Sequence, residues 1–95
     1  QSGDDNDGFI TQGEDADDNG ASIEQSGQRN IADVFQNTDA NEASVLQEGN
    51  NNEALVNQGD EGENVGDENF ADISQSGNRN YAELNQSTNL NSATI

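Results

Sequence analysis

Small apolar residues recur at a fixed interval along the chain and alternate with polar ones. Counting from a glutamine, an asparagine follows five places later, an alanine seven places later and Ile, Val or Leu nine places later. Residues two places apart share one face of a β-strand, whereas on a helix these four positions would scatter around the axis. The pattern therefore predicts a strand in every unit, followed by a turn in the Gly or Thr region before the next asparagine.

This unit is basically 11 residues long, occurs eight times and covers the whole chain; the first unit has Gly8 in place of the alanine. Its glutamine and asparagine positions are Gln1, Asn6, Gln12, Asn19, Gln25, Asn30, Gln36, Asn41, Gln47, Asn52, Gln58, Asn69, Gln75, Asn80, Gln86 and Asn91. None of the 32 positions in the Gln, Asn, Ala and aliphatic columns is charged, although the chain holds 20 Asp and Glu. An acidic disordered segment has no reason to keep these columns neutral.

A second period of about 22 residues is superimposed on the first. Glycine stands two places after the glutamine in the odd-numbered units, at Gly3, Gly27, Gly49 and Gly77. The even-numbered units lack it, and two of them carry acidic insertions within 13–18 and 59–68. We therefore expect one domain, residues 1–95, with both insertions on one side of it. Its four repeats should span 1–24, 25–46, 47–74 and 75–95.

One pair of units cannot bury its inner face alone, so stacking of successive pairs is required. We expect an all-β fold: a β-solenoid of the cross-β type with two parallel, in-register sheets and four rungs. Identical side chains then lie above one another. The Asn and Gln amides are expected to pair amide to amide, while Ala and Ile, Val or Leu interdigitate between the sheets.

Composition adds mainly exclusions. The apolar fraction is 27% and the net charge is −18, which by themselves are typical of disorder. The absence of His and Cys excludes imidazole and thiol catalysis and the usual zinc sites, and two Arg without Lys argue against nucleic acid as a partner. No apolar run is long enough to span a membrane. No signal peptide is visible, and the start at Gln1 suggests a processed product.

The repeat resembles that of the curlin family of curli amyloid subunits, whose pattern is Gln-x-Gly-x-x-Asn-x-Ala-x-x-x-Gln. It reads Gln-Ser-Gly-Gln-Arg-Asn-Ile-Ala-Asp-Val-Phe-Gln over 25–36 and Gln-Ser-Gly-Asn-Arg-Asn-Tyr-Ala-Glu-Leu-Asn-Gln over 75–86. The resemblance implies an extracellular, self-assembling fibre in a bacterial biofilm matrix. It also implies a nucleator, a chaperone and an outer-membrane secretion pore as partners. The acidic insertions depart from the family pattern.

The insertions raise the question of a metal site. Asp15, Asp17, Asn19 and Gly20 match the start of a calcium-binding loop, but Ser26 stands where the bidentate Glu is needed, so an EF-hand is excluded. A looser cation site is the alternative interpretation. Its candidates are Asp15, Asp17, Asp60, Glu61 and Glu63, with Asp67 and Glu68 nearby in the sequence. We expect a solvated loop and no cofactor.

Two functions from different classes remain. Acid catalysis needs a cleft with two carboxylates in different environments, which a narrow amide-filled solenoid does not offer, so we expect no enzyme. The favoured function is a fibre subunit that stacks end to end through its Asn and Gln ladders. The alternative is a monomeric acidic solenoid module of an adhesin that binds cations or a surface.

The two arginines suggest a subunit junction. Asp5, Arg29 and Arg79 occupy the fifth place of odd-numbered units, as does Asn51. If the first rung of one molecule follows the last rung of another, Asp5 lies between its own Arg29 and the Arg79 of its neighbour. Two solubilising arginines in a turn are the equally weighted alternative.

Overall fold

The computed structural model describes residues 1–13, 17–59, 68–87 and 90–95, and within them it contains strands and no helix. Sheet A has five strands in the order β1 (Ser2–Asp4), β3 (Gly20–Gln28), β5 (Glu42–Asn50), β7 (Phe70–Asn78) and β9 (Ser92–Thr94). Sheet B has four strands in the order β2 (Asp7–Gln12), β4 (Ile31–Gln36), β6 (Glu53–Gln58) and β8 (Tyr81–Gln86). None of the described segments is a helix long and apolar enough to cross a membrane.

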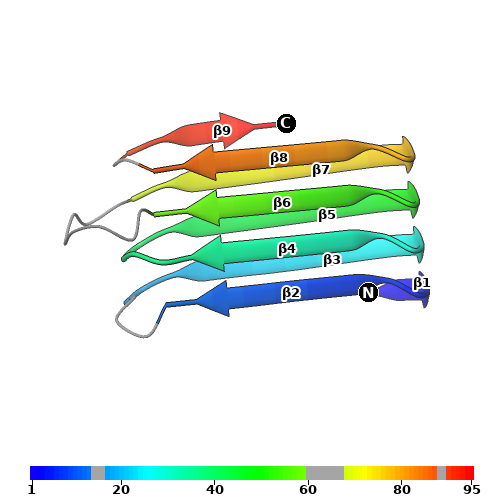
Figure 1. Cartoon of the computed structure of the whole chain (residues 1–95), viewed down its shortest axis with the longest axis horizontal. Coiled ribbons are helices and arrows are strands. Elements are labelled where there is room, and N and C mark those ends of the chain that lie inside the picture. The colour runs from blue at the N-terminus through cyan, green and yellow to red at the C-terminus, as the bar shows by residue number, and fades with distance from the viewer. Residues whose placement is uncertain (14–16, 60–67, 88–89) are drawn as a thin grey trace.

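All strand pairs are parallel, and their register follows the repeat. Gln25 pairs with Gln47 and Gln47 with Gln75 in sheet A, while Ala32 pairs with Ala54 in sheet B. The chain alternates between the sheets and rises by one rung with each return, as Figure 1 shows. The predicted β-solenoid with two in-register parallel sheets is therefore confirmed. Below, "above" means toward β9.

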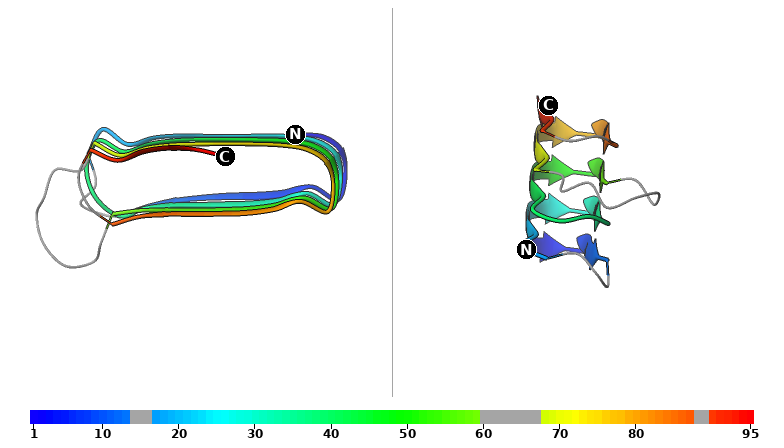
Figure 2. Two further views of the ribbon diagram at one scale, coloured as in Figure 1. Left: turned by 90° about the horizontal axis from the view of Figure 1, so that it is seen from above. Right: turned by 90° about the vertical axis from the view of Figure 1, so that its left-hand side faces the viewer.

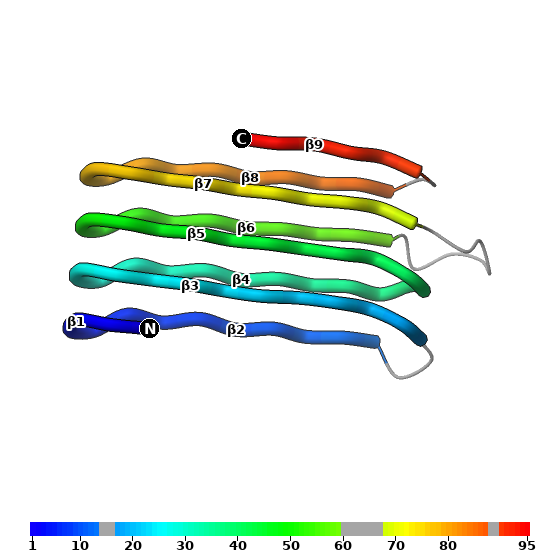
Figure 3. Tube along the Cα trace, turned by 180° about the vertical axis from the view of Figure 1, so that it is seen from behind, coloured from blue at the N-terminus to red at the C-terminus, as the bar shows by residue number. Residues whose placement is uncertain are grey.

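Seen along the stack, the rungs superimpose on one flattened outline with a sheet on each long side (Figure 2). We call the edge where sheet A leads into sheet B the glycine edge, since Gly27, Gly49 and Gly77 lie beside it. The opposite edge, where sheet B leads into sheet A, is the insertion edge. The view from behind in Figure 3 shows the same stack of rungs with the two edges exchanged.

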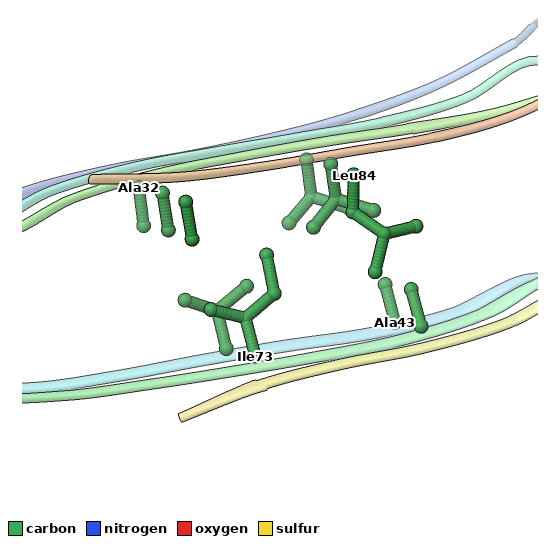
Figure 4. Packing of buried hydrophobic residues seen from close by; sticks show 10 residues of the cluster. Ala32, Ala43, Ile73 and Leu84 are labelled. Carbon is green, nitrogen blue, oxygen red and sulfur yellow. The ribbon is translucent and has the colours of Figure 1, made fainter. Parts of the chain in front are cut away.

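The core is a thin layer of alanines and aliphatic side chains between the sheets. Its fully buried members include Ala32 and Val56 from sheet B and Ala43 and Ile73 from sheet A. Figure 4 shows the large side chains of one sheet opposite the alanines of the other, with Leu84 pointing toward the sheet that carries Ala43. This pairing of large with small fills the narrow interior, as predicted. Burial of a single Val, Ile or Leu contributes about 1.5–3 kcal/mol, so this small core leaves the buried amides a decisive role.

The turns at the glycine edge are tighter than the sequence predicts. We expected the turn in the Gly region, but β3 continues through Gly27 to Gln28, and the chain reverses at Arg29 and Asn30. Gly27 keeps its place in the ladder with Gly49 because φ of +111° is accessible to a residue without a Cβ. The strands β3, β5 and β7 of sheet A that pass this edge therefore reach nine residues, against six in sheet B.

Candidate functional site: the amide columns

Glutamine side chains form two hydrogen-bonded columns along the stack. Near the glycine edge Nε2 of each glutamine donates to Oε1 of the glutamine above, over 2.8 Å from Gln1 to Gln25 and 2.9 Å at the next two steps. Near the insertion edge the column from Gln12 to Gln86 repeats this over 3.0 to 3.1 Å. The predicted amide-to-amide pairing is thus found at every glutamine step.

The same amides also join the two sheets. Nε2 of Gln47 donates to the backbone O of Ile31 at 3.0 Å, and Nε2 of Gln36 donates to that of Gly20 at 2.8 Å. The side chains of Gln36 and Gln47 are 0% exposed. An unpaired buried amide costs roughly 1–3 kcal/mol, so complete pairing is what allows amides to fill this interior.

The asparagine columns pair differently from what the sequence suggests. Oδ1 of the lower asparagine accepts the backbone N–H of the one above, from Asn52 to Asn30 at 3.0 Å and from Asn41 to Asn19 at 2.7 Å. Amide-to-amide bonds occur at some steps, such as Asn69 to Asn41 at 3.0 Å. The short side chain lies in the turn, where its Oδ1 takes the place of a ladder carbonyl and satisfies a backbone donor.

A left-handed residue precedes the asparagine in seven turns. The residues with φ between 56° and 60° are Asp5, Asp18, Arg29, Ala40, Asn51, Arg79 and Leu90. Asp and Asn adopt this conformation readily, but Arg, Ala and Leu do not. At these positions, backbone hydrogen bonds to the rung below accompany the conformation: the N–H of Arg29 donates to the O of Asp4 at 3.1 Å, and that of Ala40 donates to the O of Asp17 at 2.9 Å. Sequence reasoning missed the left-handed residues because only some of them are Asp or Asn.

Acids on the outward face of sheet B do not lie directly above one another. Strand pairing forms one column of Asp7, Ile31, Glu53 and Tyr81. The adjacent column holds Phe9, Asp33, Leu55 and Glu83. Acidic and apolar side chains thus alternate as predicted, which keeps like charges from the closest axial distance within the chain.

Two additional amide ladders lie on the outward faces. Asn50 donates to Oδ1 of Asn78 at 3.2 Å on sheet A, and Asn57 donates to Oδ1 of Asn85 at 3.1 Å on sheet B. Sequence reasoning missed both ladders, although aligning the repeats places these asparagines in the same columns. They extend the axial hydrogen bonding beyond the interior.

Glu83, on the outward face of sheet B, accepts hydrogen bonds from two neighbouring side chains. Nδ2 of Asn85 and the hydroxyl of Tyr81 each donate to it at 2.9 Å. The bond from Asn85, followed by that from Tyr81, holds the pKa of Glu83 below its ordinary value. The hydrogen bond between Tyr81 and Glu83 raises the pKa of Tyr81, because the tyrosine hydroxyl donates to a carboxylate.

Of the five metal candidates, only Asp17 lies among the described residues. Asp15, Asp60, Glu61 and Glu63 lie outside the described residues. Asp17 is exposed, and its backbone N–H donates to the carboxylate of Asp39 at 2.8 Å. No group of three or more acidic residues within the described ranges is placed to hold a metal ion.

The residues of the predicted junction share one column at the glycine edge. Asp5, Arg29, Asn51 and Arg79 all have left-handed φ and exposed side chains. Within the described part of the chain, no carboxylate lies within 4.0 Å of either guanidinium. The contact between Asp5 and a neighbour's Arg79 stays a prediction.

Comparison with known proteins agrees with this geometry. The family model of the curlin associated repeat matches residues 27–59 and 66–95. No curated protein and no solved structure matches the chain. Proteins of this repeat family are structural rather than enzymatic. With two matched segments over most of its length and a solenoid stacked through Asn and Gln columns, this chain belongs to the curlin associated repeat family.

Proposed function

We propose that the chain is the structural subunit of an extracellular, self-assembling fibre of the curli type in a bacterial biofilm matrix. Its partner is a further copy of itself, which adds rungs in the same register. By family membership, a nucleator, a chaperone and an outer-membrane secretion pore complete the assembly route. Asn and Gln ladders are the assembly site, and no reaction is catalysed.

The observation that carries the proposal is an unpaired amide at the lower end of an asparagine column. Nδ2 of Asn19 is the one buried polar side-chain atom among the described residues that has no hydrogen-bond partner. Two rungs higher, Nδ2 of Asn69 donates to Oδ1 of Asn41, one rung below it. A rung added beneath Asn19 would supply the same acceptor, and a buried unpaired donor favours such an addition.

The strand edges support the same conclusion. Above β8 and below β2, no further strand of sheet B lies among the described residues. Unpaired edges of parallel strands are templates for another chain, and the repeat offers side chains that match them. The alternative of a monomeric acidic adhesin module requires these edges to remain unpaired.

Thioflavin-T fluorescence and negative-stain images of the purified 95-residue chain distinguish the two functions. The fibre subunit gives sigmoidal growth, unbranched fibres and a shorter lag when preformed fibres are added. Calcium titration with light scattering on the same preparation tests the adhesin module. A chain that stays monomeric at high concentration and at high salt would contradict the proposed function.

A further inference from the structure

The four inward columns do not distinguish the two edges of a rung. Along each strand from its turn, both sheets present Asn, Ala, an aliphatic residue and Gln in the same order. The contacts are also equivalent: Gln58 donates to the backbone O of Glu42, and Gln47 donates to that of Ile31. A complete rung rotated by half a turn about the stacking axis would therefore present the same ladders to another complete rung. At the upper end of the chain, β9 additionally covers part of sheet A and none of sheet B.

Other contacts distinguish the two edges. At the insertion edge the glutamine amide also donates to the backbone O of the next asparagine, as Gln36 does to Asn41 at 3.0 Å. The glycine edge instead has a contact between successive rungs. Nδ2 of Asn52 donates across to the backbone O of Gly77 in the rung above at 3.0 Å, and Asn30 does the same with Gly49. At the insertion edge Nδ2 of Asn41 instead donates within its own turn, to the backbone O of Thr38 at 2.9 Å. Among the described residues, the glycine edge thus connects successive rungs through a contact that the insertion edge lacks.

This contact needs glycine for two reasons. Gly77 has φ of +107°, a conformation that a residue with a side chain rarely adopts, and this conformation turns its carbonyl toward the rung below. A Cβ on Gly49 would lie 2.0 Å from the O of Gly77, so the lower residue must lack a side chain. Each rung therefore needs glycine for two purposes. Its carbonyl must point downward, where it accepts from the asparagine below, and it must leave room for the carbonyl of the glycine above.

The space above Gly77, the last glycine of the chain, holds no further glycine carbonyl. A Cβ on Gly77 would meet only Nδ2 of Asn80, at 3.7 Å. Nδ2 of Asn80 donates to the backbone O of Ser76, whereas Nδ2 of Asn52 donates both to Glu48 O and to Gly77 O. We infer that Gly77 and Asn80 form a docking seat that accepts only a rung with glycine two places after its glutamine, and so fixes which edge of an incoming copy lies at the glycine edge. This inference rests on the proposed fibre function.

The seat has a defined consequence for fibre shape. A rung that arrives rotated brings Thr38 or its equivalents to the position above Gly77, and none of the even-numbered units has glycine there. Rejection of rotated copies keeps all insertion edges on one side of the fibre. It also makes the partner specific, because a chain with the same amide ladders but without this glycine would be excluded.

Spin-label distances in fibres test the seat directly. A single nitroxide at Asn37→Cys marks the insertion edge, because Asn37 is exposed and directly follows Gln36 at the end of β4. With the register kept, labels of adjacent copies are four rungs apart, or about 19 Å at about 4.8 Å a rung. Rotated copies place adjacent labels on opposite edges, about 30 Å or more apart for nine-residue strands. A peak near 19 Å that disappears on dilution with unlabelled chain is expected; its absence overturns the seat.

Seeded growth provides the second test. Gly77→Ala chains should add as one layer at one end of wild-type seeds and then stop, since the new Cβ blocks the next carbonyl. Gly20→Ala is the matched control, because its Cβ would meet only Cγ of Glu42 at 4.0 Å and its φ is not left-handed, so it should elongate at the wild-type rate. Elongation of Gly77→Ala at the rate of the control would overturn the seat while leaving the fibre function intact.

The outcomes separate the two proposals. Failure of the wild-type chain to form fibres would contradict the proposed function and, with it, the seat. Fibres without the peak near 19 Å contradict only the seat. The label measurement does not depend on whether the Gly77→Ala chain folds, so a misfolded variant does not remove the test.

Discussion

Nε2 of Gln36 donates to Oε1 of Gln58 at 3.1 Å, and neither side chain is exposed to solvent. Gln36 also donates to the backbone O of Gly20 on the facing sheet. One primary amide therefore connects successive rungs and opposite sheets, which a hydrocarbon side chain of the same size cannot do. Because the apolar core is thin, this double use of buried amides explains how a chain with few apolar residues keeps a fold.

Removal of an amide from the middle of a column should destabilise the chain much more than removal of an outward acid. Gln47→Ala deletes the bonds to Gln75 and Ile31 and removes the acceptor of Gln25, at a cost of about 1–3 kcal/mol. Asn41→Ala should have a similar effect. Asp33→Ala, on the outward face of sheet B, is the control and should be nearly neutral. Denaturant unfolding measures the stability of each variant, and lag times measure its assembly. If Asp33→Ala had as large an effect as Gln47→Ala or Asn41→Ala, the assignment of inward and outward faces would be wrong.

Alternation of acids should control growth at low salt. The double change Asp33→Ile with Ile31→Asp keeps composition but stacks three acids, at positions 7, 31 and 53, in one column of sheet B. Growth should slow at low ionic strength and recover at high salt, since screening removes the repulsion between neighbouring carboxylates. Elongation rates over a salt series provide the measurement. A rate that matches wild type at low salt would show that alternation has no kinetic role.

The pKa of Glu83 should depend on its neighbour Asn85. That pKa is lowered in the folded chain, so Glu83 stabilises the fold above its unfolded pKa, and this contribution is lost as pH falls through the folded value. Asn85→Ala removes the Nδ2 donor that contributes most to the lowered pKa, so the pKa of Glu83 should rise toward its ordinary value. Carbon-13 NMR titration of the carboxyl group measures the change. Asn50→Ala, which alters sheet A only, should leave the Glu83 titration where it was.

The predicted junction can be tested through Arg79. This residue lies in the uppermost described turn of its column, so it faces whichever rung is added above. An exposed ion pair with Asp5 of the next copy would contribute only about 0.2–1 kcal/mol, mainly as a preference for one orientation. Arg79→Gln should slow elongation at low salt more than Arg29→Gln, which stays inside the chain. Equal rates for the two variants would mean that Arg79 is only a solubilising residue.

Most of the architecture follows from the spacing of a few residue types. Residues two places apart must share a strand face, so the Gln, Asn, Ala and aliphatic columns and their in-register stacking could be predicted without a structure. The ladder residues of the inner rungs, such as Gln47 and Asn52, are buried as predicted. The repetition made this prediction possible, because residues of the same column occupy the same environment in successive rungs.

The turns were less predictable because their geometry depends on neighbouring rungs. Arg29, Ala40 and Leu90 have no local preference for left-handed φ; hydrogen bonds from Asn30, Asn41 and Asn91 to the rung below accompany it. β3 likewise continues through Gly27 by pairing with Gly49 one rung above, whose carbonyl leaves no room for a Cβ on Gly27. Such contacts between residues about 22 positions apart leave no signal within a single unit.

A cryo-electron microscopy map of fibres grown from the 95-residue chain tests the central claim most directly. Four strands in sheet B give four rungs, so the expected axial repeat is about 19 Å per subunit at a rung spacing of about 4.8 Å. The Gln and Asn columns should continue without interruption from one subunit to the next. An axial repeat of three or five rungs, or amide columns that break at each subunit boundary, would contradict the proposed assembly.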